Sequence, residues 1–397
     1  MSTRSISSAL RSLGCRGSSS SSWFALKSHR HFSSTAHNAV RAVFTETDNE
    51  ELNIVLNTIQ ERIILPAHLP EKQRKIVFDP KKRSHLEQNP IVIEVDGLEH
   101  KFSSIDRFKG IENSKKALSK ALDNMHTARD WANLGTLLAG YKKAGIRLKA
   151  DHWGKITRLA GTRGHIYAVI ECAKQSDQTG LFLKKPEIVT RVLACVNNKI
   201  SESAGNAGET KQALKWAEVV LDLLQRPEHA MADQQTRERL HFSRLVRGMV
   251  LFARASAVST GTAAERDSDL LKDEVALLTS LWDDAVNKDL VEITEFAKLN
   301  PTLERNASQS GNNTPQALNG SAYVQVLAQN IRGIEIAQEI VGQDAQVLSP
   351  ILNTLKSHLQ DFATKSETRT EGWAEEYEKV MGTKANWPAV IKKTVHA

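Results

Sequence analysis

The sequence predicts an all-α protein of stacked antiparallel helix pairs, an α-solenoid, with one small β-hairpin near residues 90–105. Two observations predict this fold. From position 112 onward, apolar residues recur with the helical period in successive segments separated by short polar breaks. The segments GIRLKAD, from Gly145, and GLFLKKP, from Gly180, also resemble each other and begin 35 residues apart. A fixed period of that size is typical of helical repeats.

The N-terminus has the composition of a targeting segment. The first 45 residues contain no Asp or Glu, carry six Lys or Arg residues and are rich in serine. These are the features of a mitochondrial transit peptide, and the alternative is a disordered cytosolic tail. We therefore expect residues 1–35 to be a removable presequence and the protein to work in the mitochondrial matrix. No apolar run is long enough to span a membrane.

Charge is distributed unevenly along the chain. The net charge is +7, but five basic residues precede Phe32, and without them it falls to +2. Residues 70–199 hold 25 Lys or Arg against 14 Asp or Glu, whereas residues 200–397 hold 21 against 27. This asymmetry predicts a polyanion such as RNA as the partner of the basic half, and other proteins as partners of the acidic C-terminal half.

Three elements are expected between residues 46 and 110. Residues 46–69 predict a helix, with acidic residues in its first turn and apolar residues at helical spacing. Residues 71–89 predict a basic connector, either a solvated linker or an arm that touches phosphates. Apolar residues alternate with polar ones from Ile91, and Asp96-Gly97 supplies the turn of the predicted hairpin.

The remaining chain predicts a helical-repeat domain at 111–300, a flexible linker or loop at 301–321 and C-terminal helices at 322–397. Apolar stripes place the later helices at 188–200, 209–225, 235–256, 268–290, 322–342, 345–364 and 370–381. The stretch at 306–321, NASQSGNNTPQALNGS, has the composition of a loop.

Residues 115–190 resemble the pentatricopeptide-repeat family, whose units pair two antiparallel helices. The features that carry the resemblance are an early aromatic, a turn glycine, an alanine in the second helix and a glycine-basic-proline end: Trp153, Gly164, Ala168, Gly180 and Lys184-Lys185-Pro186. The resemblance implies organelle RNA metabolism or translation, including structural roles in mitochondrial ribosomes. Lys155 stands where the family carries a small base-reading side chain, which predicts phosphate contact instead of sequence readout.

The basic residues of this region are the predicted RNA-phosphate contacts, because the basic excess is regional. They are Lys142, Lys143, Arg147, Lys149, Lys155, Arg158 and Arg163, with Lys81, Lys82 and Arg83 of the connector as a second group. The alternative for each is an ordinary solvated helix face.

Other candidate residues favour a structural interpretation. Trp131, Trp153, Trp216 and Trp282 lie among apolar residues at helical spacing, which favours core packing over stacking on bases. The acidic cluster Asp267, Asp269, Asp273 and Glu274 falls at the start of a predicted helix, where acids offset the dipole, which favours capping over metal binding.

No catalytic motif is present, so neither an enzyme activity, a cofactor nor a metal is predicted. The sequence predicts a non-catalytic mitochondrial protein that binds RNA, ribosomal RNA or mRNA, or a ribonucleoprotein, and that forms part of the mitochondrial ribosome. The alternative is a protein-only scaffold or assembly factor of the matrix that serves respiratory-chain biogenesis.

Overall fold

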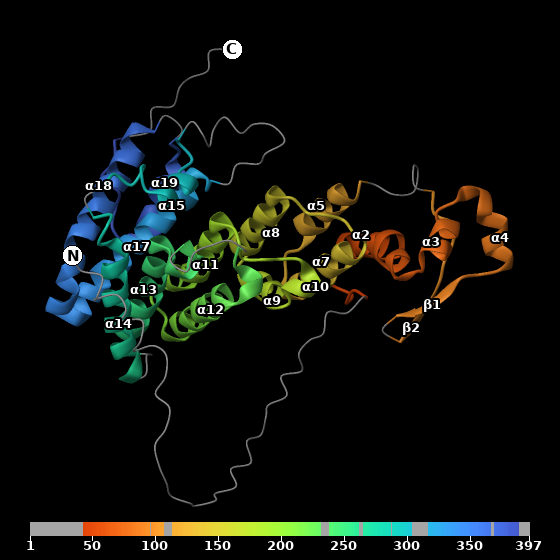
Figure 1. The fold of residues 1–397 in the computed structure, drawn as a ribbon, viewed down its shortest axis with the longest axis horizontal. Coiled ribbons are helices and arrows are strands. Elements are labelled where there is room, and N and C mark those ends of the chain that lie inside the picture. Colours follow the sequence, from red (N-terminus) through yellow and green to blue (C-terminus); the bar gives the residue numbers. More distant parts are fainter. Residues whose placement is uncertain are drawn as a thin grey trace, which may run out of the picture. The chain divides into compact units, whose positions relative to one another are not determined.

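In the part of the chain that the structure describes, regular structure is helical apart from one two-stranded antiparallel sheet, which confirms the predicted fold class (Figure 1). A computed structural model describes residues 43–95, 97–106, 113–231, 238–261, 265–286, 288–303, 317–366 and 369–388. The predicted transit peptide at 1–35 and most of the predicted loop at 301–321 lie outside these residues.

The predicted helix at 46–69 begins later than expected, because Asn49 caps it. The Oδ1 atom of Asn49 accepts a hydrogen bond from the backbone N–H of Leu52 at 3.1 Å, and α2 runs from there over Glu50–Ile59. A π-helical turn, η1 (Gln60–Ile64), and a 3₁₀ turn, η2 (Leu65–His68), continue the same path. Pro70 precedes the next helix, as expected for a residue that cannot continue α2.

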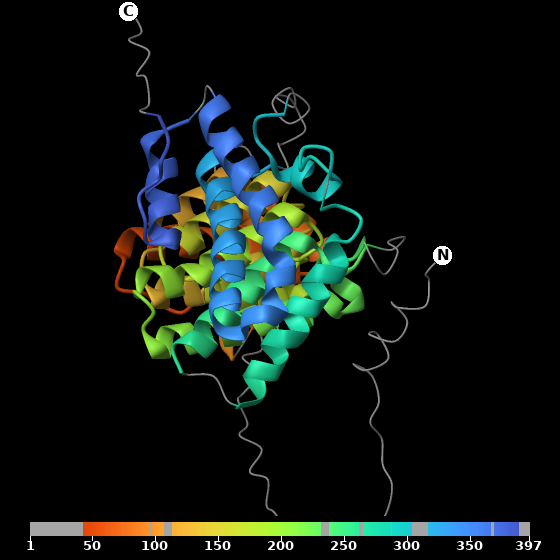
Figure 2. The same cartoon turned by 90° about the vertical axis from the view of Figure 1, so that its left-hand side faces the viewer.

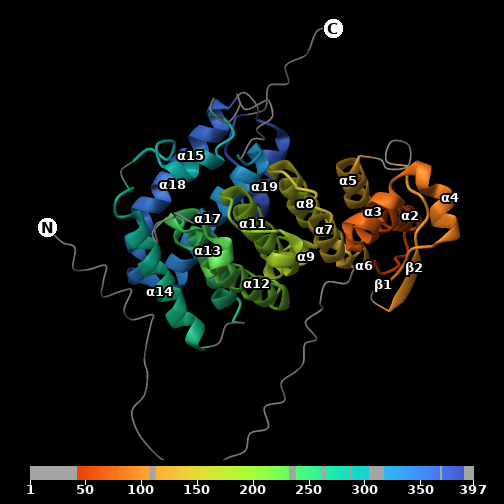
Figure 3. The same ribbon diagram turned by 45° about the vertical axis from the view of Figure 1, so that its right-hand side comes forward.

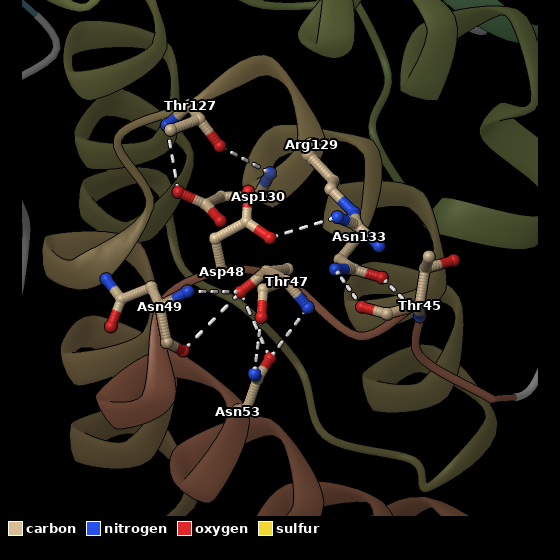
Figure 4. Close-up of polar contacts among 9 residues, drawn as sticks. All are labelled: Thr45, Thr47, Asp48, Asn49, Asn53, Thr127, Arg129, Asp130 and Asn133. Carbon is tan, nitrogen blue, oxygen red and sulfur yellow. Dashed lines mark hydrogen bonds and ion pairs between the residues drawn. The ribbon is translucent and has the colours of Figure 1, made fainter.

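Residues 43–49 form an extended segment, here called the strap, that docks on residues of the short helix α6 (Ala128–Ala132) and on Asn133 just after it (Figure 4). The backbone N–H of Thr45 donates to Oδ1 of Asn133 at 2.8 Å, and Nδ2 of Asn133 donates to the Thr45 carbonyl at 2.9 Å. Asp48 forms an ion pair with Arg129 at 3.1 Å. These contacts fix the strap to residues more than 80 positions away in the sequence.

Asp130 organises the end of the loop that receives the strap. Its carboxylate is buried and accepts hydrogen bonds from the backbone N–H groups of His126 and Thr127 at 2.9 and 2.8 Å, which completes a capping box. Burial acts to raise the pKa of the Asp130 carboxyl. The hydrogen bonds, including those from the hydroxyls of Thr127 and Thr47, outweigh burial and hold this pKa below its ordinary 3.8.

The depressed pKa makes the stability contributed by Asp130 depend on pH. A carboxyl with a lowered folded pKa stabilises the fold above its unfolded pKa, near 3.8, and loses this effect as pH falls through the folded pKa. We expect Asp130→Asn to cost about 1 kcal/mol at pH 7. Urea unfolding should show the difference from wild type shrinking below pH 3.8, and a difference that grows on acidification would contradict this assignment.

Residues 71–89, predicted as a basic connector, fold mostly into short helices. They form α3 (Glu71–Val77), the 3₁₀ turn η3 (Pro80–Lys82) and α4 (Arg83–Gln88). Pro70 directly precedes α3 and Pro80 begins η3, and the Asp79 side chain caps η3 by accepting from the N–H of Lys81 at 3.0 Å. These residues adopt helical structure because α3 and α4 both contribute apolar side chains to one small core, which is separate from the main core.

That small core also receives the predicted hairpin, which is confirmed. Strands β1 (Val92–Val95) and β2 (Leu98–Lys101) pair antiparallel, with Val92 opposite Lys101 and Val95 opposite Leu98. A lone hairpin is only marginally stable, and this one gains apolar cover from the short helices. The buried members of the small core are Leu65, Leu69, Val77, Leu86, Phe102 and Ile105.

The middle of the chain forms two rows of helices. The first row consists of α5 (Ser114–Asn124), α8 (Ala150–Thr162) and α11 (Pro186–Glu202), in which each helix packs on the next. The second row consists of α7 (Leu134–Lys143), α9 (Ile166–Lys174) and α12 (Ala207–Gln225), likewise in contact. The rows can be followed in Figure 1. Two short helices accompany the second row, α6 (Ala128–Ala132) and α10 (Ser176–Thr179).

Helix α17 (Gly320–Val341) is the centre of the C-terminal part. It packs against α13 (Arg244–Ser259), α18 (Ser349–Lys365), α19 (Glu371–Met381) and also α11. Figure 2 shows α17 and α18 side by side in blue. The remaining elements are η4 (Pro227–His229), η6 (Leu240–Phe242), α14 (Glu265–Trp282), α15 (Thr294–Leu299) and η7 (Gly342–Leu348).

Close packing of α13 on α17 depends on Gly333. A methyl group on Gly333 would lie 2.8 Å from the backbone N and 2.9 Å from Cα of Phe252. Because a packed helix backbone cannot rotate aside as a side chain can, Gly333→Ala should lower the free energy of unfolding by about 1–3 kcal/mol. In the control Gly372→Ala the new methyl meets nothing closer than 3.8 Å, so this variant should be neutral or slightly stabilising in urea unfolding. Equal midpoints for the two variants would contradict the argument.

Candidate nucleic-acid interface

A basic hollow lies along α5, at the N-terminal end of the first row (Figure 3 shows α5 and α8). We call it the α5 hollow. It is open to solvent and has a volume of about 540 Å³. Its lining comes from α5 and the residue before it, from α2 and from α8: Asn113, Lys115, Lys116, Ser119, Lys120, Asp123, Asn124, Glu51 and His152.

The amphipathic pattern of α5 explains why its lysines line the hollow. Ala117, Leu118, Ala121 and Leu122 are buried, so the opposite side of the helix faces outward. Lys116 and Lys120 are exposed there, and Lys115 is half-buried. Among the described residues, none of these three lysines has an ion-pair partner.

This placement of charge costs helix stability. Lys115 and Lys116 stand in the first turn of α5, where the dipole favours anions, and no acidic residue offsets them there. Lys116 and Lys120 are also a like-charge pair at i and i+4, a spacing at which repulsion costs about 0.2–0.5 kcal/mol. A bound anion would remove both penalties. The arrangement therefore favours a polyanionic ligand over a merely solvated face.

Lys155, a predicted residue of α8, contacts a residue that lines the hollow. The Nζ atom of Lys155 forms an ion pair with Oδ2 of Asp123 at 3.0 Å and is 27% exposed. This pair neutralises one of the two acidic residues that line the hollow, which leaves the α5 lysines less compensated. Arg158 follows one turn later on α8 and is exposed.

The structure places Arg163 in an internal contact. Its guanidinium donates hydrogen bonds to the backbone carbonyls of Leu122 at 2.7 Å, Met125 at 2.5 Å and Asp123 at 2.9 Å. These carbonyls end α5, where a cation satisfies acceptors that lack helical partners and complements the dipole. Arg163 thus ties α8 to α5 and positions the hollow.

Lys142 and Lys143, at the end of α7, and Arg147, in the loop after it, do not line the α5 hollow. Lys149 directly precedes α8, and its backbone N–H donates to Nδ1 of His152, a lining residue, at 3.3 Å. The Nζ atom of Lys142 donates to the carbonyls of Asp177 and Ser176, the latter at 3.5 Å, and lies 5.8 Å from the ring centroid of Phe182. The other three candidates are exposed: Lys143, Arg147 and Lys149.

The connector candidates form a third group, on the small core. Lys81, Lys82 and Arg83 are exposed, and Arg83 pairs with Glu87 at 3.0 Å. The basic residues proposed together from sequence therefore fall in three places. None of the ten lines the hollow itself, but Lys155 pairs with Asp123 and Lys149 bonds to His152, and both of these partners line it.

Sequence reasoning missed Lys115, Lys116 and Lys120. The signal was present, since an amphipathic helix with lysines in its first turn, and at i and i+4, contradicts ordinary helix electrostatics. The prediction rested on basic residues after position 140, within the clearest repeat signal, and so overlooked the helix that precedes them.

The other predictions on side chains have mixed outcomes. Trp131 and Trp282 are fully buried, which confirms core packing for these two, whereas Trp153 and Trp216 are partly exposed at the edge of the main core. Within the described residues, no group of three His, Cys, Asp or Glu side chains is placed to hold a metal ion. No helix of the described part is long and apolar enough to cross a membrane.

The acidic cluster at the start of α14 contains one buried member. Glu274 is 6% exposed and accepts two hydrogen bonds from Nη1 of Arg247, at 3.1 and 3.3 Å. Burial raises the pKa of the Glu274 carboxyl, and the guanidinium groups of Arg247 and Arg254 oppose that rise. Glu274 therefore belongs to the contact between α13 and α14.

These observations define a helical scaffold whose first row carries a lysine-lined hollow. A sequence profile of the family described as mitochondrial ribosomal protein mS27 matches residues 30–381. The chain belongs to this family of mitochondrial ribosomal proteins. Membership confirms the predicted location in the mitochondrial matrix and the predicted ribosomal class.

A curated relative supports the same assignment. The chain is 30% identical over 196 residues to the small ribosomal subunit protein mS27 of Neurospora crassa. The alignment covers 49% of this chain and 50% of the relative, so the chain spans about half the length of the relative that it matches.

Proposed function

We propose that this protein is a non-catalytic structural component of the small subunit of the mitochondrial ribosome and binds RNA phosphates through the α5 hollow. The observation that carries the proposal is the set of three lysines on α5 without ion-pair partners among the described residues, placed where helix electrostatics disfavours them. A phosphate backbone supplies the missing anions and releases counterions on binding. Ribosomal family membership favours this role over an assembly factor for the respiratory chain.

The assignment to pentatricopeptide-like repeats is part of the same proposal. Three features support it: paired helices in two rows, a first-row helix starting at Ala150 and again at Pro186, and left-handed glycines before each start. Gly145 and Gly180 have φ values of +72° and +75°. Both glycines end a second-row segment in the conformation that an L side chain rarely adopts, which explains the repeated motif.

We further propose that the repeats hold RNA by its backbone and do not read base sequence. Lys155, at the expected base-reading position, is engaged with Asp123 and presents a charge instead of a short hydrogen-bonding group. The acidic residues of the C-terminal half are the proposed contacts with other proteins.

Sedimentation of mitochondrial lysate tests the ribosomal role. The full chain should sediment with the small ribosomal subunit at moderate salt. It should move to the light fractions after RNase digestion or in high salt, because phosphate contacts are screened. Migration with a membrane complex, unaffected by RNase, would overturn the proposal in favour of the protein-only scaffold.

A further inference from the structure

An aromatic pair stands at the surface of the second row, on helices that do not line the α5 hollow. The rings of Tyr167, in α9, and Trp216, in α12, are stacked with centroids 4.9 Å apart and planes 21° from parallel. Tyr167 is 38% exposed. Aromatic rings placed only for core packing are covered, whereas this stack reaches solvent and joins two neighbouring helices of the row.

Lysines surround this pair. The Nζ atom of Lys174 lies 5.2 Å from the centroid of Tyr167, and Nζ of Lys199 lies 5.1 Å from the centroid of Trp216. Lys211 and Lys215 lie one turn apart on α12, five positions and one position before Trp216, and are exposed with no ion-pair partner among the described residues. They repeat the unfavourable i and i+4 pairing of α5.

The nearby acids compensate only part of this charge. Lys174 pairs with Glu171 at 2.6 Å, and Lys199 pairs with Glu209. Glu171 and Glu209 thus offset Lys174 and Lys199, and the remaining positive charge of this region comes from Lys211 and Lys215 of α12. The local surplus is positive and favours an anionic ligand with a flat apolar part.

We propose that Tyr167 and Trp216, with Lys211 and Lys215, form a binding platform for an unpaired nucleotide of RNA. The exposed tyrosine ring supplies a stacking surface for the base, and the lysines contact the adjoining phosphates. Stacking on aromatic side chains flanked by cations is the general mode of single-strand binding, because every base has a π face. The platform rests on the proposed RNA role and adds to it a contact that requires a base.

An abasic RNA separates this platform from the α5 hollow. The full chain is titrated with a single-stranded RNA of about ten nucleotides, within the usual range of site sizes, and with the same strand lacking its bases. Tyr167→Leu retains apolar cover but removes the π face. It should weaken binding of the intact strand about tenfold and leave binding of the abasic strand unchanged.

Matched variants complete the test. Tyr167→Phe keeps the ring and should bind both strands as wild type does. Lys115→Glu with Lys116→Glu and Lys120→Glu should weaken both strands equally, since the hollow contacts phosphates. If Tyr167→Leu binds the intact strand as wild type does, or weakens both strands alike, the platform is overturned while the hollow stands. If no variant changes the binding of either strand, the RNA role of both surfaces is overturned.

Discussion

Replacing Lys115, Lys116 and Lys120 together with glutamate should reduce RNA affinity about a hundredfold at 0.15 M salt. Through counterion release, each lysine–phosphate contact raises the RNA affinity at 0.15 M salt about fivefold over its value at 1 M salt. The loss of three such contacts therefore lowers the affinity by about the product of three fivefold factors. The slope of log affinity against log salt should fall by about two to three units, which filter binding over a salt series measures directly. The α5 helix itself should gain stability, because glutamates in its first turn suit the dipole.

A control variant carries the same charge change far from the hollow. Lys288, Lys365 and Lys384 are exposed residues of the C-terminal half, and their replacement with glutamate alters net charge equally. This control should keep a salt slope close to that of wild type. Equal losses in both triple variants would mean that net charge alone attracts RNA, and the hollow would then have no special role.

Removal of the Glu274 carboxylate should destabilise the fold by about 3–5 kcal/mol. Glu274→Ala leaves the guanidinium of Arg247 without its partner in a site where the arginine side chain is only 12% exposed. Water cannot replace the lost carboxylate there, so the buried charge remains uncompensated. Urea unfolding followed by circular dichroism measures this loss as a shift in midpoint.

The double variant Glu274→Leu with Arg247→Met separates the charge effect from packing. Apolar residues of similar volume often replace a buried ion pair at little cost, so the double variant should regain much of the stability that Glu274→Ala loses. If the double variant is as unstable as Glu274→Ala, the contact between α13 and α14 depends on side-chain shape and the ion pair has little effect.

The helices were predictable wherever apolar spacing was regular. The spacing of Ala117, Leu118, Ala121 and Leu122 predicts a helix with that face buried, and the structure confirms this helix. The short helices α3 and α4 were missed because seven or six residues show too little periodicity to distinguish a helix from a polar connector. Their coiling depends on the small core, which forms only when the hairpin folds back on them.

The candidate site was predictable in charge but not in geometry. A basic excess between residues 70 and 199 is visible in the composition, yet it does not say which cations are free to bind. Arg163 and Lys155 are drawn to groups about 40 and 32 positions earlier in the chain, and no local pattern reveals such partners. Exposure and pairing are properties of the packed rows, so the α5 hollow emerged only from the structure.

The strap also sets an order for folding in the organelle. A chain that enters the matrix N-terminus first delivers Thr45 long before Asn133, which lies 88 positions later. During import, therefore, the strap stays undocked and accessible to proteases until the chain around Asn133 has entered the matrix. A mature N-terminus that started beyond Asn49 would lack both the strap and the cap of α2. Because the predicted presequence, residues 1–35, ends before the strap begins at residue 43, its removal would leave the strap in place.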